Sequence, residues 1–191
     1  MHDFVLPEHD WQQALAAAAA AGDERPTWGY RWPAGERLAA DLPAMGLCAG
    51  CRCVDLGCGR GHLGLTALAA GATAVCFADG SRHPLRYLEQ VISCNELGDR
   101  ATTSLHRWGE PLPGSPWQVI LGGDILYRPE CFAALFNTIA TSLSPDGAAY
   151  LSDPRSCLEK NLPALATAAG CQLTIERVAD NYSLVVLRLH P

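Results

Sequence analysis

Short apolar runs alternate along the chain with longer stretches of helical spacing. The apolar runs are predicted strands and cover residues 51–56, 74–78, 102–106, 117–121 and 148–151. The longer stretches are predicted helices and cover residues 61–70, 84–97, 129–143 and 162–169. Strands that alternate with helices at this spacing are typical of a parallel sheet with helices on both faces.

The end of the chain breaks this alternation. Two predicted strands, residues 171–177 and 183–189, are joined at Asp180-Asn181 without a helix between them, so they must form a hairpin with one strand antiparallel. The first strand alternates apolar and polar residues, as at a sheet edge, whereas 184–187 is apolar on both faces, as in an interior strand. The pattern therefore predicts an α/β, doubly wound sheet of seven strands whose last strand lies inside the one before it.

Residues 1–33 are predicted to form an accessory segment of helical and aromatic character. The alanine-rich stretch 11–21 has strong helix propensity and little amphipathic pattern, and an aromatic run follows at 28–32. Residues 34–191 are expected to form one domain that begins with a short helix at 36–42. A chain of 191 residues is long enough for one sizeable core and too short for two.

The composition disfavours several classes of protein. Hydrophobic residues make up 49% and charged residues 18%, which disfavours disorder. The net charge of -6 disfavours general, sequence-independent binding of nucleic acid. No apolar run approaches the ~20 residues of a membrane-spanning helix. No basic region precedes the alanine run, as it would in a signal peptide. We therefore expect a cytoplasmic protein that binds neither membrane nor nucleic acid.

The nine cysteines are expected to be mostly reduced, buried thiols. Cys48, Cys51 and Cys53 lie close together in the sequence, but a structural zinc site normally needs a second pair of cysteines or two histidines at matching spacing. The sequence therefore predicts no metal site.

A glycine-rich turn at residues 55–61 lies between a predicted strand and a predicted helix. Glycines there let the backbone turn sharply and let a ligand approach the main chain closely. Residues 59–64 fit the dinucleotide pattern G-x-G-x-x-G, and Asp79 lies at about the spacing of a ribose-binding acid. Asp55, however, sits two residues before the first glycine, where an acid suits a cationic, amino-acid-bearing ligand better than a pyrophosphate.

The pattern Asp55-x-Gly57-x-Gly59-x-Gly61 resembles motif I of class I S-adenosylmethionine-dependent methyltransferases. Three further segments are similar to the protein-lysine methyltransferases of the methyltransferase-16 type. These segments are Trp32-Pro-Ala-Gly35, Trp108-Gly109 and Asp124-Ile-Leu-Tyr127. The resemblance implies a Rossmann-like, seven-stranded sheet in which the antiparallel seventh strand lies between strands five and six.

The resemblance also implies the cofactor and the residues that contact it. The cofactor is S-adenosylmethionine, with S-adenosylhomocysteine as product. Asp79 would receive the ribose hydroxyls, and Trp108 would stack on or flank the adenine. Glycine at 123, where the family commonly has alanine, predicts looser packing. The expected cofactor-binding residues are Trp32, Asp55, Gly57, Cys58, Gly59, Gly61, Asp79, Gly80, Trp108 and Gly123.

By the same resemblance, the reaction is N-methylation of a lysine side chain on a protein, with Asp124 and Tyr127 as the catalytic residues. A lysine amine has a pKa of ~10.4, so its deprotonation near neutral pH costs about 4 kcal/mol. Asp124 would hold and orient the ammonium and help its proton to leave to water. Tyr127 would supply a wall, a hydrogen bond or a cation–π face.

Other functions stay open at the level of sequence. A small-molecule methyltransferase would use the aromatic N-terminal segment as a closed lid. A dinucleotide-binding oxidoreductase and a non-catalytic binding module would each explain the glycine turn differently. The segment after the fourth strand lacks the proline pair of enzymes that methylate planar amide or nucleobase nitrogens. His62, His83 and His106 lie near the expected cofactor loops and are interpreted as local hydrogen-bonding residues rather than catalysts.

Overall fold

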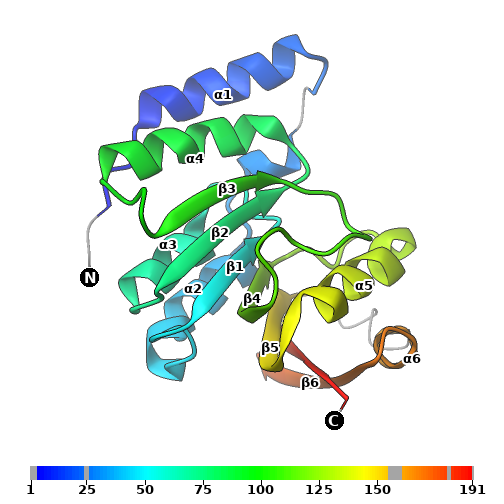
Figure 1. Cartoon of the computed structure of the whole chain (residues 1–191). Coiled ribbons are helices and arrows are strands. Elements are labelled where there is room, and N and C mark those ends of the chain that lie inside the picture. Colours follow the sequence, from blue (N-terminus) through cyan, green and yellow to red (C-terminus); the bar gives the residue numbers. More distant parts are fainter. Residues whose placement is uncertain (1–3, 24–25, 155–160, 180–181, 191) are drawn as a thin grey trace.

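The computed structural model describes residues 4–23, 26–154, 161–179 and 182–190. Its centre is one seven-stranded sheet (Figure 1). The strands are β1 Arg52–Leu56, β2 Ala74–Asp79, β3 Ala101–Leu105, β4 Trp117–Gly123, β5 Leu143–Asp153, β6 Cys171–Ala179 and β7 Tyr182–Leu189. Their order in the sheet is β3-β2-β1-β4-β5-β7-β6.

The strand directions confirm the fold expected from the sequence. Neighbouring strands from β3 to β5 pair in parallel, whereas β7 pairs antiparallel with both β5 and β6. The last strand, β7, therefore lies between β5 and β6. Its apolar residues Leu184, Val185 and Leu187 are buried on both faces, as expected of an interior strand. The turn predicted at Asp180-Asn181 lies outside the described residues.

Helices cover both faces of the sheet. They are α1 Glu8–Ala20, α2 Pro33–Met45, α3 His62–Ala69, α4 Arg82–Cys94, α5 Phe132–Ser142 and α6 Leu162–Ala168, with short 3-10 turns η1 Thr27–Gly29 and η2 Pro129–Cys131. Residues of α2, α3 and α4 belong to one buried cluster, and those of α5 and α6 to a second. Figure 1 shows α1 lying along the outer side of α4.

Some element boundaries differ from the sequence prediction. Helix α2 begins at Pro33 rather than at residue 36, because proline is preorganised for the first turn of a helix. The segment at Pro129 forms a 3-10 turn before α5 begins. Strand β5 begins at Leu143 rather than at residue 148, and the pairing with β4 shifts register between Leu143 and Ala148. The segment Ser144-Pro-Asp-Gly147, which follows the predicted helix, is therefore an irregularity within a strand.

The N-terminal helix is held to the rest of the chain by an aromatic cluster. Trp11 of α1 is 2% exposed. Its ring packs edge-on against Trp28 and against Tyr87 of α4, with 5.3 and 4.8 Å between the ring centroids. The Arg60 guanidinium lies 4.5 Å from the Trp11 ring, and the same group forms an ion pair with Glu8 at 3.0 Å. Arg60 belongs to the glycine turn, so these contacts connect α1 to that turn. The predicted division at residue 33 falls in the first turn of α2 and stays a prediction.

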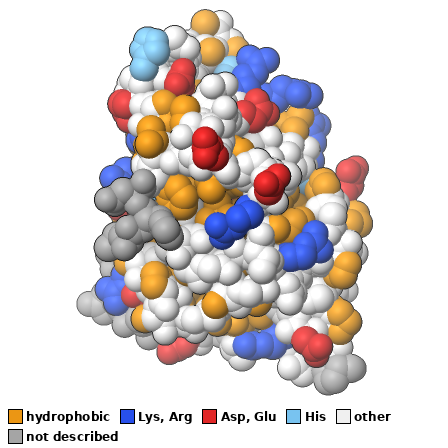
Figure 2. Space-filling model, turned by 60° about the vertical axis from the view of Figure 1, so that its left-hand side comes forward, with side chains coloured by type: hydrophobic (Ala, Val, Ile, Leu, Met, Phe, Trp, Pro, Cys, Tyr) orange, Lys and Arg blue, Asp and Glu red, His pale blue; other side chains and the backbone are white. Residues whose placement is uncertain are grey.

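The surface is not uniformly acidic despite the net charge of -6. Figure 2 shows Lys and Arg side chains beside hydrophobic ones across the middle of one face. In the described ranges, no helix combines the length and the apolar character needed to cross a membrane.

Candidate active site

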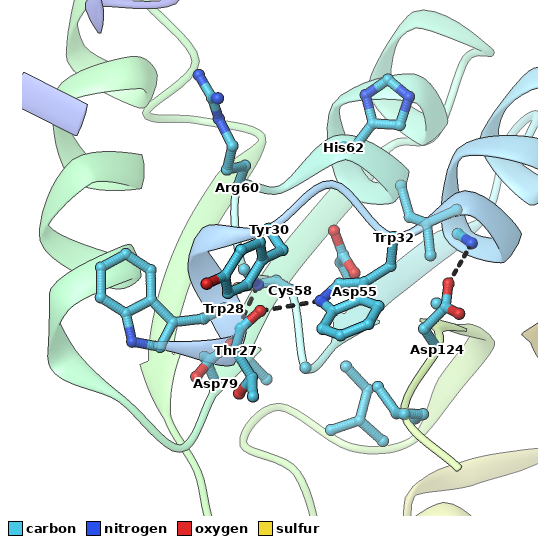
Figure 3. A pocket seen from close by; sticks show the side chains of 18 of the residues that line it. Thr27, Trp28, Tyr30, Trp32, Asp55, Cys58, Arg60, His62, Asp79 and Asp124 are labelled. Atoms are coloured by element: carbon cyan, nitrogen blue, oxygen red, sulfur yellow. Dashed lines mark hydrogen bonds between the residues drawn. The ribbon is translucent and has the colours of Figure 1, made fainter. Parts of the chain in front are cut away.

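A cavity of about 1280 Å³ opens at the carboxyl ends of the central strands. Its lining comes from the glycine turn after β1, the ends of β2 and β4, the loop after β3 and the segment that precedes α2. The sheet order reverses between β1 and β4, and this switch point is where open α/β sheets bind their ligands. Figure 3 shows the cavity, with Asp79 and Asp124 toward opposite ends and Trp32 between them.

The glycine turn is anchored to β2 and to the N-terminal segment. The backbone N–H groups of Gly57 and Cys58 both donate to the carbonyl oxygen of Ala78, at 2.8 and 3.1 Å. Gly59 has a φ of 48°, and a Cβ there would lie 3.0 Å from the Trp28 carbonyl oxygen. Glycine is favoured at this position because the left-handed backbone strains any other residue and the Trp28 carbonyl leaves little room for a side chain.

Asp55 is the penultimate residue of β1 and precedes the glycine turn. Its Oδ2 accepts a hydrogen bond from the N–H of Gly64 in the first turn of α3, at 2.8 Å, and the residue is 2% exposed. Burial raises the pKa of Asp55 to about 8; the Gly64 N–H lowers this pKa and the nearby charge of Asp79 raises it. The carboxyl group lines the cavity and serves also as a cap for α3.

Asp79 ends β2 and is held on both carboxylate oxygens. Oδ1 accepts from the N–H of Ser81 at 2.8 Å, and Oδ2 accepts from the N–H of Gly59 at 3.1 Å. Burial raises the pKa of Asp79, and hydrogen bonds from the N–H groups of Ser81, Gly59 and Gly80 oppose that rise. The carboxyl group is thereby fixed in orientation at one end of the cavity.

Asp124 follows β4 and contacts the start of α2. Its backbone is left-handed, with φ 55°, and its N–H donates to the Ser152 carbonyl at 2.8 Å. Its Oδ2 accepts a hydrogen bond from the N–H of Gly35 at 2.6 Å, drawn as a dashed line in Figure 3. Gly35 is in the first turn of α2, so Asp124 caps this helix from a distant part of the chain.

Exposed aromatic side chains line part of the cavity, and they come from the segment before α2 and from the loop after β4. Trp32 donates its Nε1–H to the Thr27 carbonyl at 2.9 Å, and its ring makes an edge contact with Tyr30 at 5.9 Å. Tyr127 follows Asp124, and the Arg128 guanidinium lies 5.5 Å from the Tyr127 ring. Arg31 beside Trp32 forms an ion pair with Glu36.

The sequence-predicted site residues lie around this one cavity, with a single exception. Gly61 does not line it, because the position of its absent side chain faces Leu88 and Phe77 in the core. With a φ of 77°, Gly61 contributes to the conformation of the turn. The predicted residues that line the cavity are Trp32, Asp55, Gly57, Cys58, Gly59, Asp79, Gly80, Trp108, Gly123, Asp124 and Tyr127.

Several lining residues were not predicted as part of the site. Trp28 was not among the predicted site residues, and His106 was interpreted as a local hydrogen-bonding residue, yet both line the cavity. Each has a buried ring nitrogen, Nε1 and Nε2 respectively, without a hydrogen-bond partner among the described residues. The aromatic run at 28–32 could have identified Trp28 and Tyr30 as cavity-lining residues. No motif spacing identifies His106.

The packing around Gly123 is not the looser packing that the sequence had led us to expect. A Cβ on Gly123 would lie 2.8 Å from the Gly35 Cα, a distance that real side chains do not reach. Glycine therefore permits a close backbone contact between the end of β4 and the start of α2. The packing is tighter, not looser, than alanine would allow.

The remaining sulfur and metal candidates form no site in the part of the chain that the structure describes. The cysteines there are free thiols, and Cys48, which precedes β1, and Cys53 within β1 are buried away from the cavity lining. No group of three or more His, Cys, Asp or Glu side chains among the described residues is arranged to hold a metal ion.

Comparison with known proteins agrees with the geometry. The family described as lysine methyltransferase matches residues 32–162. The electron transfer flavoprotein beta subunit lysine methyltransferase of Danio rerio is 29% identical over 135 residues, which make up 68% of this chain and 50% of that protein. The chain thus spans about half the length of the curated relative that it matches.

Solved structures share the fold at low sequence identity. The 1,6-didemethyltoxoflavin-N1-methyltransferase of Burkholderia thailandensis has a TM-score of 0.69 and 19% identity, covering 100% of this chain and 94% of that chain. The ribosomal protein L11 methylase of Lactobacillus delbrueckii subsp. bulgaricus has a TM-score of 0.67 and 17% identity, covering 88% of this chain and 91% of that chain. At these identities the likeness establishes the fold alone.

Proposed function

The chain belongs to the lysine methyltransferase family, and from that membership we propose that it methylates the ε-amino group of a lysine side chain on a protein. It is an S-adenosylmethionine-dependent methyltransferase, as the resemblance of its motifs predicted. A dinucleotide-binding oxidoreductase, which the glycine spacing alone left open, is thereby excluded. The identity of the acceptor and the roles of the individual residues are parts of the proposal.

The polar groups of the cavity fit S-adenosylmethionine, which supplies an activated methyl group on a sulfonium. Asp79, held by two backbone N–H groups, is suited to accept hydrogen bonds from ribose hydroxyls. The glycine turn and Asp55 are suited to the cationic amino-acid portion. Trp108, partly buried beside the α5 side of the core, offers an aromatic wall for the base.

Asp124 is the proposed partner of the acceptor amine. The lysine ammonium must lose a proton before its nitrogen can attack, and a nearby carboxylate holds and orients the ammonium while that proton leaves to water. Asp124 is 7% exposed, lines the cavity and is fixed by the start of α2. Tyr127 would flank the amine, and most of the rate would come from alignment of the nitrogen with the methyl group.

Open aromatic side chains at the cavity support a protein acceptor over a small molecule. Tyr30 and Trp32 of the N-terminal segment are 56% and 45% exposed and Tyr127 is 41% exposed, which favours an open cavity over one closed by an aromatic lid. Arg31 and Arg128 lie beside these rings. Exposed tyrosine, tryptophan and arginine are the residue types that protein interfaces favour. This exposed aromatic edge of the cavity, formed by Tyr30, Trp32 and Tyr127, is the observation that carries the proposal.

Asp124→Asn tests the catalytic assignment. Asparagine keeps an oxygen for the Gly35 N–H and tolerates the left-handed backbone, but it cannot neutralise an ammonium. We expect methyl transfer to fall by about 100-fold or more, with the affinity for S-adenosylhomocysteine unchanged. Tritiated methyl transfer into lysate protein and calorimetric titration of the product measure the two quantities.

The acceptor class is tested in the same assay. Protease treatment of the lysate should abolish incorporation, and mass spectrometry should find the label on lysine. Incorporation that survives protease would instead assign a small-molecule acceptor. Unchanged turnover in Asp124→Asn, or loss of cofactor affinity in that variant, would contradict the role of Asp124.

A further inference from the structure

Arginine is concentrated in the lining of the cavity. The chain as a whole has 20 Asp and Glu against 14 Lys and Arg. Three acids of the lining, Asp55, Asp79 and Asp124, already have places in the proposed function. The other charged residues that line the cavity are Arg31, Glu36, Arg60, Arg107 and Arg128. Apart from those three acids, the lining is therefore positive in a chain that is acidic overall.

Ion pairs neutralise two of these arginines. Arg31 pairs with Glu36, and Arg60 pairs with Glu8. The side chain of Arg128, by contrast, is exposed and forms no ion pair with any residue in the described ranges. Arg128 therefore leaves a positive charge uncompensated at the cavity.

Tyr127 restrains the Arg128 side chain. The two residues are adjacent in the loop after β4, and the Arg128 guanidinium lies 5.5 Å from the centroid of the Tyr127 ring. A cation–π contact of this kind limits the freedom of the guanidinium and leaves its N–H groups able to donate. Their fork matches the two oxygens of a carboxylate. Glu130, two residues further along, does not line the cavity. Arg128 is thus suited to a carboxylate that another molecule brings.

Arg107 adds a second uncompensated charge to the lining. It lies in the loop after β3, is exposed and has no ion-pair partner among the described residues. The Gly109 N–H of that loop donates to Oγ1 of Thr138 in α5 at 2.7 Å, and the loop that carries Arg128 leads into α5 through η2. The two arginines therefore stand on loops that adjoin the same helix, and their positive fields add.

This lining disfavours a lysine-rich acceptor. The acceptor lysine is itself a cation and the cofactor's sulfonium is another, so each further basic residue near the cavity adds like-charge repulsion. Acidic residues beside the lysine would instead be attracted to Arg107 and Arg128. Attraction of one kind of sequence combined with repulsion of the other is a common source of specificity in charged interfaces.

We propose that the acceptor lysine lies in an acidic protein segment, and that Arg128 binds an Asp or Glu side chain close to that lysine while Arg107 adds to the attraction. The inference rests on the proposed function and names the class of acceptor. Arg128 determines specificity and takes no part in proton loss or methyl transfer.

The test reads which lysines of lysate proteins become methylated. For the wild type, labelled lysines should have more Asp and Glu within about four positions, or about 14 Å of extended chain, than unlabelled lysines of the same proteins. Arg128→Gln should lower the labelling of such sites by about fivefold, and Arg128→Glu should shift the preference towards basic neighbours. Arg188→Glu is the matched control, because Arg188 is exposed, lacks an ion pair among the described residues and does not line the cavity. It should keep the wild-type pattern.

Cofactor affinity and stability separate acceptor recognition from other effects. Arg128→Glu should bind S-adenosylhomocysteine as the wild type does in calorimetry, and its melting temperature should stay within about 2 °C of the wild type. A loss of affinity for S-adenosylhomocysteine would assign Arg128 to the cofactor and overturn the proposal.

Three results of the labelling experiment would also count against it. Labelled lysines without acidic neighbours, or an unchanged pattern in Arg128→Glu, would overturn the acidic acceptor while leaving lysine methylation intact. Labelling that ribonuclease abolishes would show that the arginines hold nucleic acid instead. If no protein lysine were labelled at all, the proposed function itself would fail.

Discussion

Asp55 shows how one buried carboxyl group can serve both the fold and the site. It caps α3 through Gly64, and burial raises its pKa to about 8. In the ligand-free protein, burial favours the neutral form of the Asp55 carboxyl group. This group therefore supports the folded state most strongly at low pH. Its contribution is fully present below the unfolded pKa of ~3.9 and is lost as the pH rises toward about 8.

Asp55→Asn should therefore stabilise the ligand-free protein at pH 8. Asparagine keeps an acceptor for Gly64 and carries no charge, so its advantage over the wild type should grow from near zero at pH 4 to a melting-temperature gain of about 3 °C or more at pH 8. Differential scanning fluorimetry across this range measures the gain. A difference that does not change with pH would contradict the raised pKa.

The same carboxyl group should make cofactor binding depend on pH. A cationic amino group near Asp55 favours the ionised carboxylate, so the affinity of the wild type for S-adenosylmethionine should rise as the pH increases toward about 8. Asp55→Asn should bind more weakly and lack this rise. Calorimetric titrations at pH 6, 7 and 8 would show both effects.

At the scale of elements, the contact between α2 and the end of β4 organises the site. The backbones meet at Gly35 and Gly123, and the Gly35 N–H holds the Asp124 carboxylate. Helix α2 follows directly after Trp32, so one contact sets the relative position of the aromatic edge and the proposed catalytic acid.

Gly123→Ala should disturb this contact. A Cβ 2.8 Å from the Gly35 Cα requires a backbone shift, and overpacking of this kind costs about 1–3 kcal/mol. We expect that loss in the free energy of unfolding from urea titrations, together with slower methyl transfer. Gly98→Ala is the matched control, since a Cβ there meets nothing within 4 Å, and it should change stability by less than about 0.5 kcal/mol. Equal stability of the two variants would contradict the close contact.

At the scale of the whole molecule, the N-terminal segment packs as part of the core. Trp11 is buried between Trp28 and α4, and Arg60 connects it to the glycine turn. An accessory segment that could be removed freely would not place its largest side chain at 2% exposure.

Trp11→Ala tests whether the chain unfolds as one unit. Removal of a buried tryptophan costs about 3–5 kcal/mol, and we expect a single unfolding transition shifted by that amount, followed by circular dichroism. Arg37→Ala, which removes an exposed Arg37–Asp41 pair, should cost less than about 1 kcal/mol. Loss of α1 alone, with the remaining chain unfolding as before, would instead support a separable segment.

The sequence by itself determined the elements and their broad arrangement. The apolar periods, the glycine turn and the helix-free hairpin depend on local backbone preferences and on which face of an element is buried, so they can be recognised within short windows. The edge position of β6 and the interior position of β7 followed from the polarity of residues such as Gln172 and Val185. The motif segments likewise pointed to most of the cavity lining, because parallel strands bring the loops at their carboxyl ends together.

Only the tertiary structure decided which groups meet across the cavity. Asp124 lies 89 positions from Gly35, and no sequence pattern in either segment predicts their hydrogen bond. The unpartnered nitrogen of His106, the approach of Trp28 to Gly59 and the turn of Gly61 toward the core likewise depend on how irregular segments pack. Such contacts have no period along the chain; they result from the fit of distant elements around one core.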